Sequence, residues 1–302
     1  MVVIVSHDAG GAELLSSWAS NQSEPFCLVP DGPAKSIFKR KLGTVKILPL
    51  DQAIQKADWV LCGTSWQSDL ERIAIVTARE NGKKVVSFID HWVNYTERFI
   101  LNDALVLPDE IWIADQDAKG IALKLFPGTP ILLVDNPYFA ELATELDKIR
   151  SSAGKDDQGI LLYVCEPIRE HALIQQADER FWCYTEEEAL KFFLDNTDVL
   201  SSSIREIRVR PHPSEDPEKY LWSTANTNQN VVISRKESLL EEIVSAEIII
   251  GCESMAMVVG LLANKRVVSS IPPGGKICGL PHSGIEHLQE LLNNPFKIEH
   301  NA

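Results

Sequence analysis

The sequence predicts an α/β protein built from two domains of similar size, each with a parallel sheet covered by helices. Three observations support this prediction. The 302 residues suffice for two average domains, short apolar runs alternate with helical patterns from end to end, and one polar stretch, 151–159, interrupts the alternation. Hydrophobic residues make up 45% and charged residues 24% of the chain, which is typical of a globular protein.

The first half contains seven short apolar runs that we interpret as strands. They are rich in β-branched residues and mostly continuous rather than alternating, which is typical of strands buried on both faces of a parallel sheet. The runs are 2–6, 26–30, 46–50, 59–64, 84–90, 110–115 and 131–135. Helical patterns lie between them, and in the clearest one, 117–126, the apolar residues recur at i, i+3, i+4, i+7 and i+8.

The alternation restarts after the polar stretch. Strands are predicted at 160–167, 206–213, 231–235, 247–251 and 265–271, with helices near 185–196, 238–246, 253–263 and 284–293. We therefore expect an N-terminal domain over 1–152, a linker over 151–159 and a C-terminal domain over 160–302. Both read as Rossmann-like domains facing a cleft. Since open α/β sheets bind ligands beyond the carboxyl ends of their strands, functional residues should follow the strands directly.

Charge and hydropathy exclude several classes of function. The formal net charge of −14 disfavours nucleic-acid binding, because such a surface repels a phosphate backbone. The basic run Lys35–Lys41 is expected to be a solvated helix face, with peripheral membrane contact as the alternative. The longest apolar stretch, 248–263, carries Glu253 and is too short to span a bilayer. Six cysteines without a C-x-x-C pair, and no signal-peptide pattern, indicate a cytoplasmic protein.

The first candidate motif follows the first strand. Its Gly10-Gly11 pair allows close approach of a ligand at the start of a helix, where an anion is favoured. His7 and Asp8 can both transfer protons, so we take them as candidate catalytic residues. The alternative is structural: Asp8 caps the helix and the glycines form the turn.

Two further strands of the first half end in polar residues. Thr64 and Ser65 can bind a hydroxylated ligand, although helix capping explains them equally well. Asp90, His91 and Trp92 bring together an acid, a base and an aromatic ring that can stack on a sugar. The alternative places Trp92 in the core. Together with Gly10 and Gly11, these residues form the predicted ligand-binding edge of the first half.

The strongest motif of the second half is Arg210-Pro211-His212-Pro213. Pro213 restricts the preceding His212 to extended conformations. An imidazole held beyond a strand can donate to a departing phosphate, and Arg210 can contact phosphate oxygens in a bidentate manner. His212 is therefore the third candidate catalytic residue, and Arg210 a candidate phosphate ligand.

A second phosphate site is predicted where a buried strand reaches Gly251 and a helix starts at once. Ser254 and the free N–H groups of the first turn resemble a phosphate site, while Glu253 can accept from ribose hydroxyls. The alternative for Glu253 is simple complementation of the helix dipole. The residues predicted to bind phosphate and ribose in the second half are Arg210, Pro213, Gly251, Glu253, Ser254 and Met255. His282 and His287 have no metal-ligand spacing, so no metal site is predicted.

Taken together, these motifs resemble the GT-B superfamily of nucleotide-sugar enzymes. The likeness rests on the glycine turn after the first strand, on Arg210-Pro211-His212-Pro213 and on residues 245–272. His212-Pro213 is similar to the His-Pro motif of bacterial sialyltransferases and of capsule and teichoic-acid polymerases that use CMP- or CDP-linked donors. One departure is that Met255 follows Ser254 where those enzymes carry a second hydroxyl residue.

The resemblance implies a glycosyltransferase that moves a sugar from a CMP-, CDP- or UDP-linked donor to a surface-glycan or lipid-linked acceptor. His212 would serve the leaving phosphate and Asp8 would deprotonate the acceptor, with no metal and no cofactor. Two alternatives stay open. One is a nucleotide-sugar hydrolase or epimerase on the same fold, with His7 as the base that activates water. The other is a non-catalytic nucleotide- or glycan-binding protein.

Overall fold

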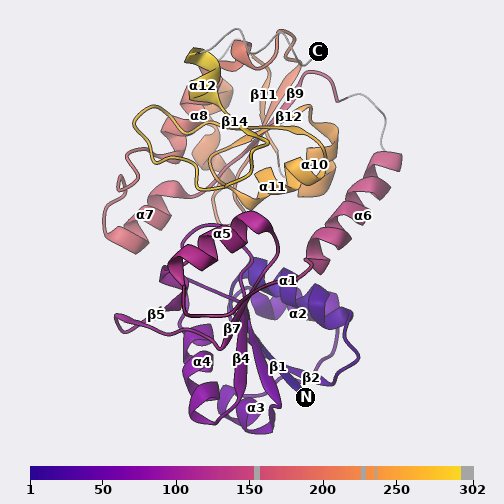
Figure 1. Cartoon of the computed structure of the whole chain (residues 1–302). Coiled ribbons are helices and arrows are strands. Elements are labelled where there is room, and N and C mark those ends of the chain that lie inside the picture. The colour runs from indigo at the N-terminus through magenta and orange to yellow at the C-terminus, as the bar shows by residue number, and fades with distance from the viewer. Residues whose placement is uncertain (153–156, 226–228, 235–236, 294–302) are drawn as a thin grey trace. The chain divides into compact units, whose positions relative to one another are not determined.

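A computed structural model describes residues 1–152, 157–225, 229–234 and 237–293. The chain divides into two compact units, Met1–Glu141 and Leu142–Ala302, and each carries a six-stranded sheet whose paired strands all run parallel (Figure 1). The predicted α/β class with two Rossmann-like halves is confirmed. The predicted linker, 151–159, starts in the last residues of helix α6 (Pro137–Ser152), and residues 153–156 lie outside the described residues.

The sheet of the N-terminal unit has the strand order β2-β1-β3-β4-β7-β8. Its strands are β1 (Val2–Ser6), β2 (Phe26–Pro30), β3 (Trp59–Cys62), β4 (Lys84–Phe88), β7 (Glu110–Ile113) and β8 (Ile131–Leu133). Its helices are α1 (Ala9–Ser20), α2 (Ala34–Leu42), α3 (Leu50–Lys56), α4 (Leu70–Glu80) and α5 (Gln116–Leu125), followed by the start of α6. A short 3-10 helix (Glu97–Phe99) and a hairpin of β5 (Ile100–Leu101) and β6 (Ala104–Leu105) precede β7.

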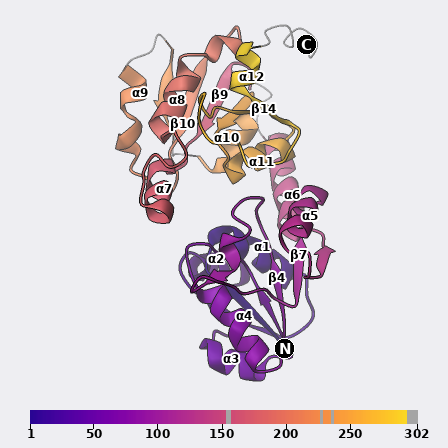
Figure 2. The same cartoon turned by 60° about the vertical axis from the view of Figure 1, so that its left-hand side comes forward.

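Helices cover both faces of this sheet (Figure 2). On one face α1 and α2 pack on the strands through a cluster that includes Leu15, Trp18 and Phe38. On the other, α4 contacts β1, β3 and β4. Every residue of β1 is buried, as the continuous apolar pattern of a central parallel strand predicts. Residues that follow β1, β3 and β4 therefore emerge at one edge of one sheet.

One predicted strand is absent. Residues 46–50 form only an isolated bridge between Leu28 and Ile47, and α3 already begins at Leu50. Ile47 is 62% exposed, so this apolar run is not part of the core. Pro49 has no N–H to donate to a strand ladder and instead stands at the N-cap of α3, which ends the extended segment.

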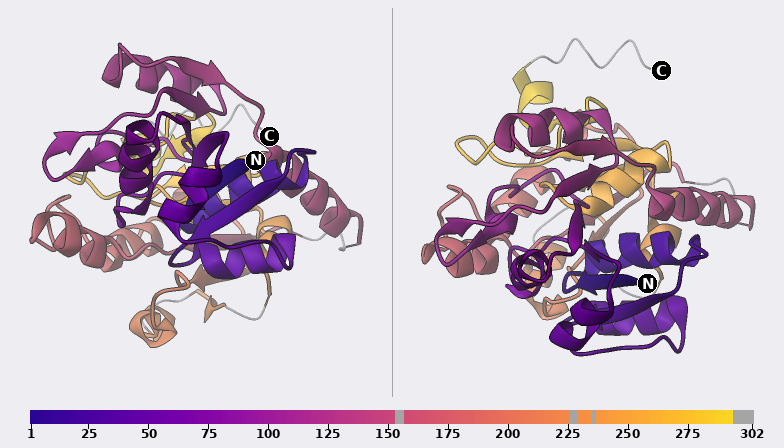
Figure 3. Two further views of the ribbon diagram at one scale, coloured as in Figure 1. Left: turned by 90° about the horizontal axis from the view of Figure 1, so that it is seen from below. Right: turned by 60° about the horizontal axis from the view of Figure 1, so that its bottom comes forward.

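The sheet of the C-terminal unit has the order β11-β10-β9-β12-β13-β14. Its strands are β9 (Ile160–Val164), β10 (Glu206–Arg210), β11 (Val231–Ile233), β12 (Ile248–Gly251), β13 (Arg266–Ser269) and β14 (Ile285–His287). Its helices are α7 (Ile168–Gln176), α8 (Glu186–Leu194), α9 (Trp222–Ala225), α10 (Leu239–Ser245), α11 (Met255–Leu262) and α12 (Leu288–Asn293), with 3-10 turns at Thr197–Val199 and Pro217–Tyr220. The helix predicted over 284–293 is thus a short strand followed by a helix. Figure 3 shows both units from two further directions.

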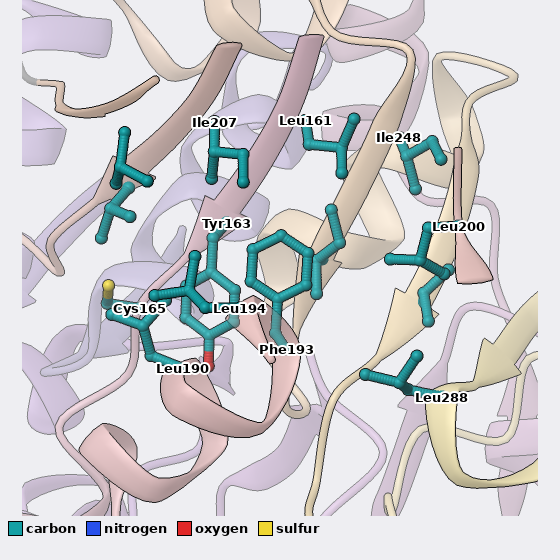
Figure 4. Close-up of a cluster of buried hydrophobic side chains, with 14 of the residues drawn as sticks. Leu161, Tyr163, Cys165, Leu190, Phe193, Leu194, Leu200, Ile207, Ile248 and Leu288 are labelled. Carbon is teal, nitrogen blue, oxygen red and sulfur yellow. The ribbon is translucent and has the colours of Figure 1, made fainter. Parts of the chain in front are cut away.

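The core of this unit lies between the sheet and α8. Figure 4 shows the Tyr163 ring of β9 beside the Phe193 ring of α8, with ring centroids 5.3 Å apart and 26° between the ring planes. Thr185 begins α8 with a complete capping box, and Ser238 does the same for α10. Since β10 and β12 both pair with β9, the residues that follow these two strands lie at the same edge of the sheet.

The features predicted from charge, hydropathy and cysteine content can also be compared with the structure. Lys35, Arg40 and Lys41 form ion pairs with Asp31, Glu13 and Glu141. The side chains of Lys35 and Arg40 are exposed, as expected for a solvated helix face, whereas that of Lys41 is only 14% exposed. Membrane contact by this run stays a prediction. Among the described residues, none of the helices combines the length and the hydropathy needed to cross a bilayer. The cysteines are free thiols, of which Cys27, Cys62, Cys165 and Cys252 are buried and Cys183 is exposed.

Candidate functional site

The turn after β1 places His7 and Asp8 against each other. The His7 Nδ1 lies 2.9 Å from Asp8 Oδ1. The Ser65 hydroxyl, in the loop after β3, donates to the same oxygen at 2.7 Å. Asp8 occupies the N-cap position of α1, but its side chain makes no capping hydrogen bond. The alternative that Asp8 only caps a helix is therefore wrong, because its carboxylate instead links Ser65 to His7.

Glycines at this edge allow close approach between groups of the protein itself. A Cβ on Gly10 would collide with the Asp90 carboxylate, and a Cβ on Gly32 would collide with His7 Nε2. A Cβ on Gly11 would lie 3.6 Å from the Gly63 Cα, so the start of α1 sits directly against the end of β3. The predicted role of the Gly10-Gly11 pair in ligand approach stays a prediction.

Asp90 follows β4 and pairs with a buried arginine. The Arg98 Nη1 lies 3.3 Å from Asp90 Oδ1 and donates to the Thr64 carbonyl and hydroxyl oxygens at 3.1 and 2.9 Å. The side chains of Asp90 and Arg98 are 11% and 5% exposed. Burial raises the pKa of Asp90, which Arg98 opposes and the nearby Asp8 charge reinforces. Asp90 is therefore a buried carboxyl near Asp8 whose charge Arg98 balances.

His91 and Trp92 turn to other partners. The His91 Nδ1 accepts from the Trp92 main-chain N–H at 3.0 Å. Trp92 is only 5% exposed, donates its Nε1–H to Asp115 Oδ2 at 2.7 Å and stacks on Phe139. The structure thus places Trp92 in the interior, which agrees with the core alternative. Stacking of Trp92 on a sugar has no direct support.

Sequence reasoning missed Glu71, the most deeply buried acid of this edge. It lies in the first turn of α4, is 1% exposed, and its Oε1 accepts from the His7 main-chain N–H at 2.7 Å. Its Oε2 is buried and accepts no hydrogen bond from the residues that the structure describes. Burial raises the pKa of Glu71 to about 7, opposed by the His7 N–H. The sequence does contain a pattern that indicates this burial. Glu71 lies at helical spacing on the same face of α4 as Ala74, Ile75 and Ala78, which are buried.

In the C-terminal unit, Arg210 is engaged by an acid. Its Nη1 forms an ion pair with Glu242, which is 0% exposed, and donates to the Glu237 carbonyl at 3.0 Å. Burial raises the pKa of Glu242, and Arg210 opposes that effect. Arg210 therefore balances the charge of the buried Glu242 carboxylate. A phosphate bound by Arg210 would share the guanidinium group with Glu242. Its role as a phosphate ligand stays a prediction.

His212 is fixed by its near neighbours in the chain. Its Nδ1 lies 2.7 Å from the Ser214 hydroxyl and accepts from the Ser214 main-chain N–H at 3.3 Å. Its own main-chain N–H donates to Glu215 Oε2 at 3.2 Å. Glu215 is 7% exposed and also accepts from the Tyr220 hydroxyl at 2.8 Å and from Lys219 Nζ at 2.6 Å. Glu215 was not predicted from the sequence.

The turn between β12 and α11 binds a carboxylate of the protein. The N–H groups of Cys252 and Glu253 donate to Glu166 Oε1 at 3.1 and 2.9 Å. Burial raises the pKa of Glu166 to about 7, and the Glu253 charge adds to this effect. The predicted anion site at this turn thus has amides directed at an acidic group. A phosphate at these two amides would have to displace Glu166.

The other residues of the predicted phosphate and ribose site make ordinary structural contacts. Ser254 caps α11 by accepting from the Ala256 N–H at 3.2 Å, and Met255 is the first residue of that helix. Glu253 pairs with Lys276 at 2.7 Å and accepts from the Gly279 N–H at 3.0 Å. A Cβ on Gly251 would lie 2.9 Å from Val164 Cγ2, so close packing explains this glycine. Pro213 lies in the exposed turn after β10. Binding of ribose by Glu253 and of phosphate by Ser254 stays predicted.

The structure brings part of the predicted site together. Within the N-terminal unit, direct contacts join His7, Asp8, Thr64, Ser65 and Asp90 through Gly10 and Arg98. Within the C-terminal unit, the groups after β10 and β12 share one sheet edge. No cluster of three or more metal-ligating side chains occurs in the described ranges.

Comparison with known proteins identifies the fold. The sequence matches no protein-family profile and no curated protein. The structure is similar to that of the UDP-GlcNAc 2-epimerase from Methanocaldococcus jannaschii, with a TM-score of 0.61, 13% identity and coverage of 100% of this chain and 93% of the other. The S. aureus MnaA–UDP co-structure gives a TM-score of 0.63 at 10% identity, covering 97% and 86%. A putative UDP-N-acetylglucosamine 2-epimerase from Listeria monocytogenes gives 0.56 at 11% identity, covering 88% and 78%.

These similarities define the class of fold: a GT-B-like pair of Rossmann-type domains, as the sequence predicted. At identities of 10–13% they establish the fold alone and do not assign a reaction. The finer resemblance to His-Pro-motif sialyltransferases and capsule polymerases stays a prediction.

Proposed function

We propose that this protein is an enzyme that cleaves the sugar–phosphate bond of a nucleotide sugar. The observation that carries the proposal is the hydrogen-bonded set Ser65–Asp8–His7 at the end of β1, on a GT-B-like fold. A histidine oriented by a carboxylate is a general base in many enzymes. In the C-terminal unit, His212 follows β10, and the amides of Cys252 and Glu253 would bind the nucleotide phosphate once it displaced the Glu166 carboxylate.

The first candidate reaction is glycosyl transfer to a glycan or lipid-linked acceptor. The acceptor hydroxyl would lose its proton to His7 or Asp8 as its oxygen bonds to the sugar. The bond between the sugar and the phosphate breaks, and its electron pair leaves with the nucleotide phosphate. His212 would hydrogen-bond or protonate that phosphate, so that the charge is balanced without a metal.

The second candidate is hydrolysis or epimerisation of the nucleotide sugar. A specific observation favours it: UDP-GlcNAc 2-epimerases are among the solved structures with the same fold over nearly the whole chain. Asp90 adds a second acid–base group beside Asp8, because burial raises its pKa and the Asp8 charge adds to that effect.

Both candidates are tested by incubating the protein with CMP-, CDP- and UDP-sugars, one at a time and without an acceptor. Free sugar or an epimer supports the second candidate. A donor that stays intact until a glycan acceptor is added supports transfer. Thermal stabilisation by nucleotide sugars without any turnover supports the non-catalytic alternative. If no nucleotide sugar binds or reacts, the proposed function is wrong.

A further inference from the structure

Arg98 is a buried arginine whose hydrogen bonds connect the ends of two neighbouring strands. It lies in the 3-10 helix after β4, and its side chain is only 5% exposed. Its Nη1 donates to the Thr64 carbonyl and hydroxyl oxygens at 3.1 and 2.9 Å, in the loop after β3. The same nitrogen lies 3.3 Å from Asp90 Oδ1, after β4, and the Nε–H donates to the Val93 carbonyl at 3.2 Å. One guanidinium group therefore holds both loops at the carboxyl edge of the N-terminal sheet.

We propose that Arg98 is a positioning residue that maintains the hydrogen-bonded set around His7 by fixing the loops after β3 and β4. Its hydrogen bonds to described residues end at Thr64, Val93 and Asp90, so it acts on His7 through those loops. All of the residues concerned belong to the N-terminal unit. The inference rests on the proposed function for its effect on turnover, whereas the arrangement of the side chains is a property of this unit alone.

The first link to His7 passes through Thr64 and Ser65. The carbonyl group that Arg98 binds belongs to the planar peptide unit that joins these two residues, so its hydrogen bond limits rotation of that unit. The Ser65 Oγ accepts from two main-chain N–H groups of its own loop at 3.1 Å each and donates to Asp8 Oδ1 at 2.7 Å. Asp8 Oδ1 in turn lies 2.9 Å from His7 Nδ1. A shift of the Thr64 carbonyl would therefore move the hydroxyl that holds Asp8.

The second link passes through Asp90 and Gly10. The Asp90 carboxylate lies so close to Gly10 that a Cβ there would collide with it, and Gly10 lies in the first turn of α1, two residues after Asp8. Burial raises the pKa of Asp90, Arg98 opposes this effect and the Asp8 charge adds to it. Loss of the guanidinium charge would leave the Asp90 carboxylate without its cationic partner, and we expect the turn that carries Asp8 to shift.

The geometry requires arginine rather than lysine at this position. A guanidinium group presents five N–H donors in one plane, and here Nε and Nη1 serve acceptors on different segments of the chain. A lysine carries the same charge on a single nitrogen atom at the end of a flexible side chain. Arg98→Lys therefore keeps a positive charge beside Asp90 and loses the planar set of donors, so that it separates geometry from electrostatics.

The arrangement is tested without a substrate, by NMR of the histidine rings. The ring C–H signals of His7 are assigned by their loss in His7→Gln. We expect Arg98→Lys to shift these signals and Arg79→Lys to leave them unchanged. Arg79 is the matched control, because it lies in the same unit, its side chain is 57% exposed and it donates to the Leu107 carbonyl at 3.1 Å. Unchanged His7 signals in Arg98→Lys that is folded by urea titration overturn the inference.

If Arg98→Lys does not fold, Thr64→Val takes its place. This variant removes the hydroxyl that accepts from Arg98 at 2.9 Å and keeps the carbonyl. We expect it to shift the His7 signals, because the Thr64–Ser65 peptide unit is then held by fewer hydrogen bonds. Thr77→Val is its control, since the Thr77 hydroxyl donates to a carbonyl of its own helix at 2.9 Å. Identical His7 signals in the two valine variants contradict the inference.

In a protein that turns over a nucleotide sugar, kinetics separate positioning from a loss of stability. We expect Arg98→Lys to lower kcat by about a hundredfold, the effect of a displacement of about 1 Å, and to change KM by less than about threefold. Arg79→Lys should keep both constants. A purely structural role of Arg98 would reduce the amount of folded enzyme and leave kcat per folded molecule at the wild-type value, which would refute the inference.

The outcomes also distinguish this inference from the proposed function. Shifted His7 signals in Arg98→Lys, in a protein that turns over no nucleotide sugar, would leave the positioning of His7 by Arg98 standing and refute the function. Wild-type turnover and unchanged His7 signals in folded Arg98→Lys would refute the inference and leave the function in place.

Discussion

The buried carboxyl of Glu71 makes a direct prediction about stability and pH. Burial raises its pKa to about 7 in the folded protein, against about 4.3 in an unfolded chain. Because the folded pKa is the higher one, the proton is retained on folding, and the associated stabilisation is complete below about pH 4.3. It is lost as the pH rises through about 7, and the full difference between the two pKa values corresponds to about 4 kcal/mol, of which about 3 kcal/mol falls between about pH 4 and about pH 8.

Replacing Glu71 by Gln removes this titration and keeps an oxygen that can accept from the His7 N–H. We expect the free energy of unfolding of Glu71→Gln, relative to wild type, to rise by about 3 kcal/mol between about pH 4 and about pH 8. The constant cost of the new amide group, which has no partner at the position of Oε2, does not alter this slope.

The assay is urea unfolding across that pH range, with hydrogen exchange of β1 and α4 amides to read the N-terminal unit separately. Glu80→Gln, at the exposed end of the same helix, changes the formal charge equally and serves as the control. If the free energy of unfolding changes with pH in the same way for Glu71→Gln and wild type, the reasoning is refuted. The Glu71 carboxyl would then not change its protonation on unfolding between about pH 4 and about pH 8.

Three further predictions concern the C-terminal unit and the turn after β1. His212→Ala should fold normally and lose about a hundredfold or more in turnover of the nucleotide sugar, measured as nucleotide release. Glu166→Gln should tighten nucleotide-sugar binding by about tenfold above pH 7, measured by calorimetry, because no carboxylate then competes for the Cys252 and Glu253 amides. Wild-type affinity should fall as the pH rises through about 7, where Glu166 ionises. Gly10→Ala should cost about 1–3 kcal/mol of stability in a urea titration, since its Cβ would displace the Asp90 carboxylate.

The strands could be predicted because the pattern that marks each strand lies within a few consecutive residues. Continuous β-branched runs such as Val2–Ser6 and Ile248–Gly251 are what parallel strands buried on both faces require. The run at 46–50 has a similar composition but contains Pro49 and an exposed Ile47, so its apolar side chains do not enter the core. Hydropathy alone does not separate these cases.

The buried acids around the two strand-end histidines were not predicted, because a single glutamate in a sequence usually lies on the solvent-exposed surface. Glu71 and Glu186 nevertheless fall on buried helix faces, Glu186 together with Ala189, Leu190 and Phe193. An acid at the helical spacing of apolar residues therefore marks a buried carboxyl that needs a partner. In both units such an acid is linked to a strand end: Glu71 accepts from His7, and Glu186 joins Lys219, which also binds Glu215.

Gly32 offers a test of His7 as the base of the proposed reaction. Gly32→Ala places a Cβ at that nitrogen, whereas Gly82→Ala introduces the same left-handed strain, at φ +64°, where no atom lies within 4 Å. Both variants should lose about 1–2 kcal/mol of stability from the backbone alone. Only Gly32→Ala should lose turnover and protect His7 from diethyl pyrocarbonate, followed by mass spectrometry of the peptide that contains residue 7. Equal turnover and equal modification in the two variants would contradict the assignment, because Nε2 would then be reached from a side that residue 32 does not cover.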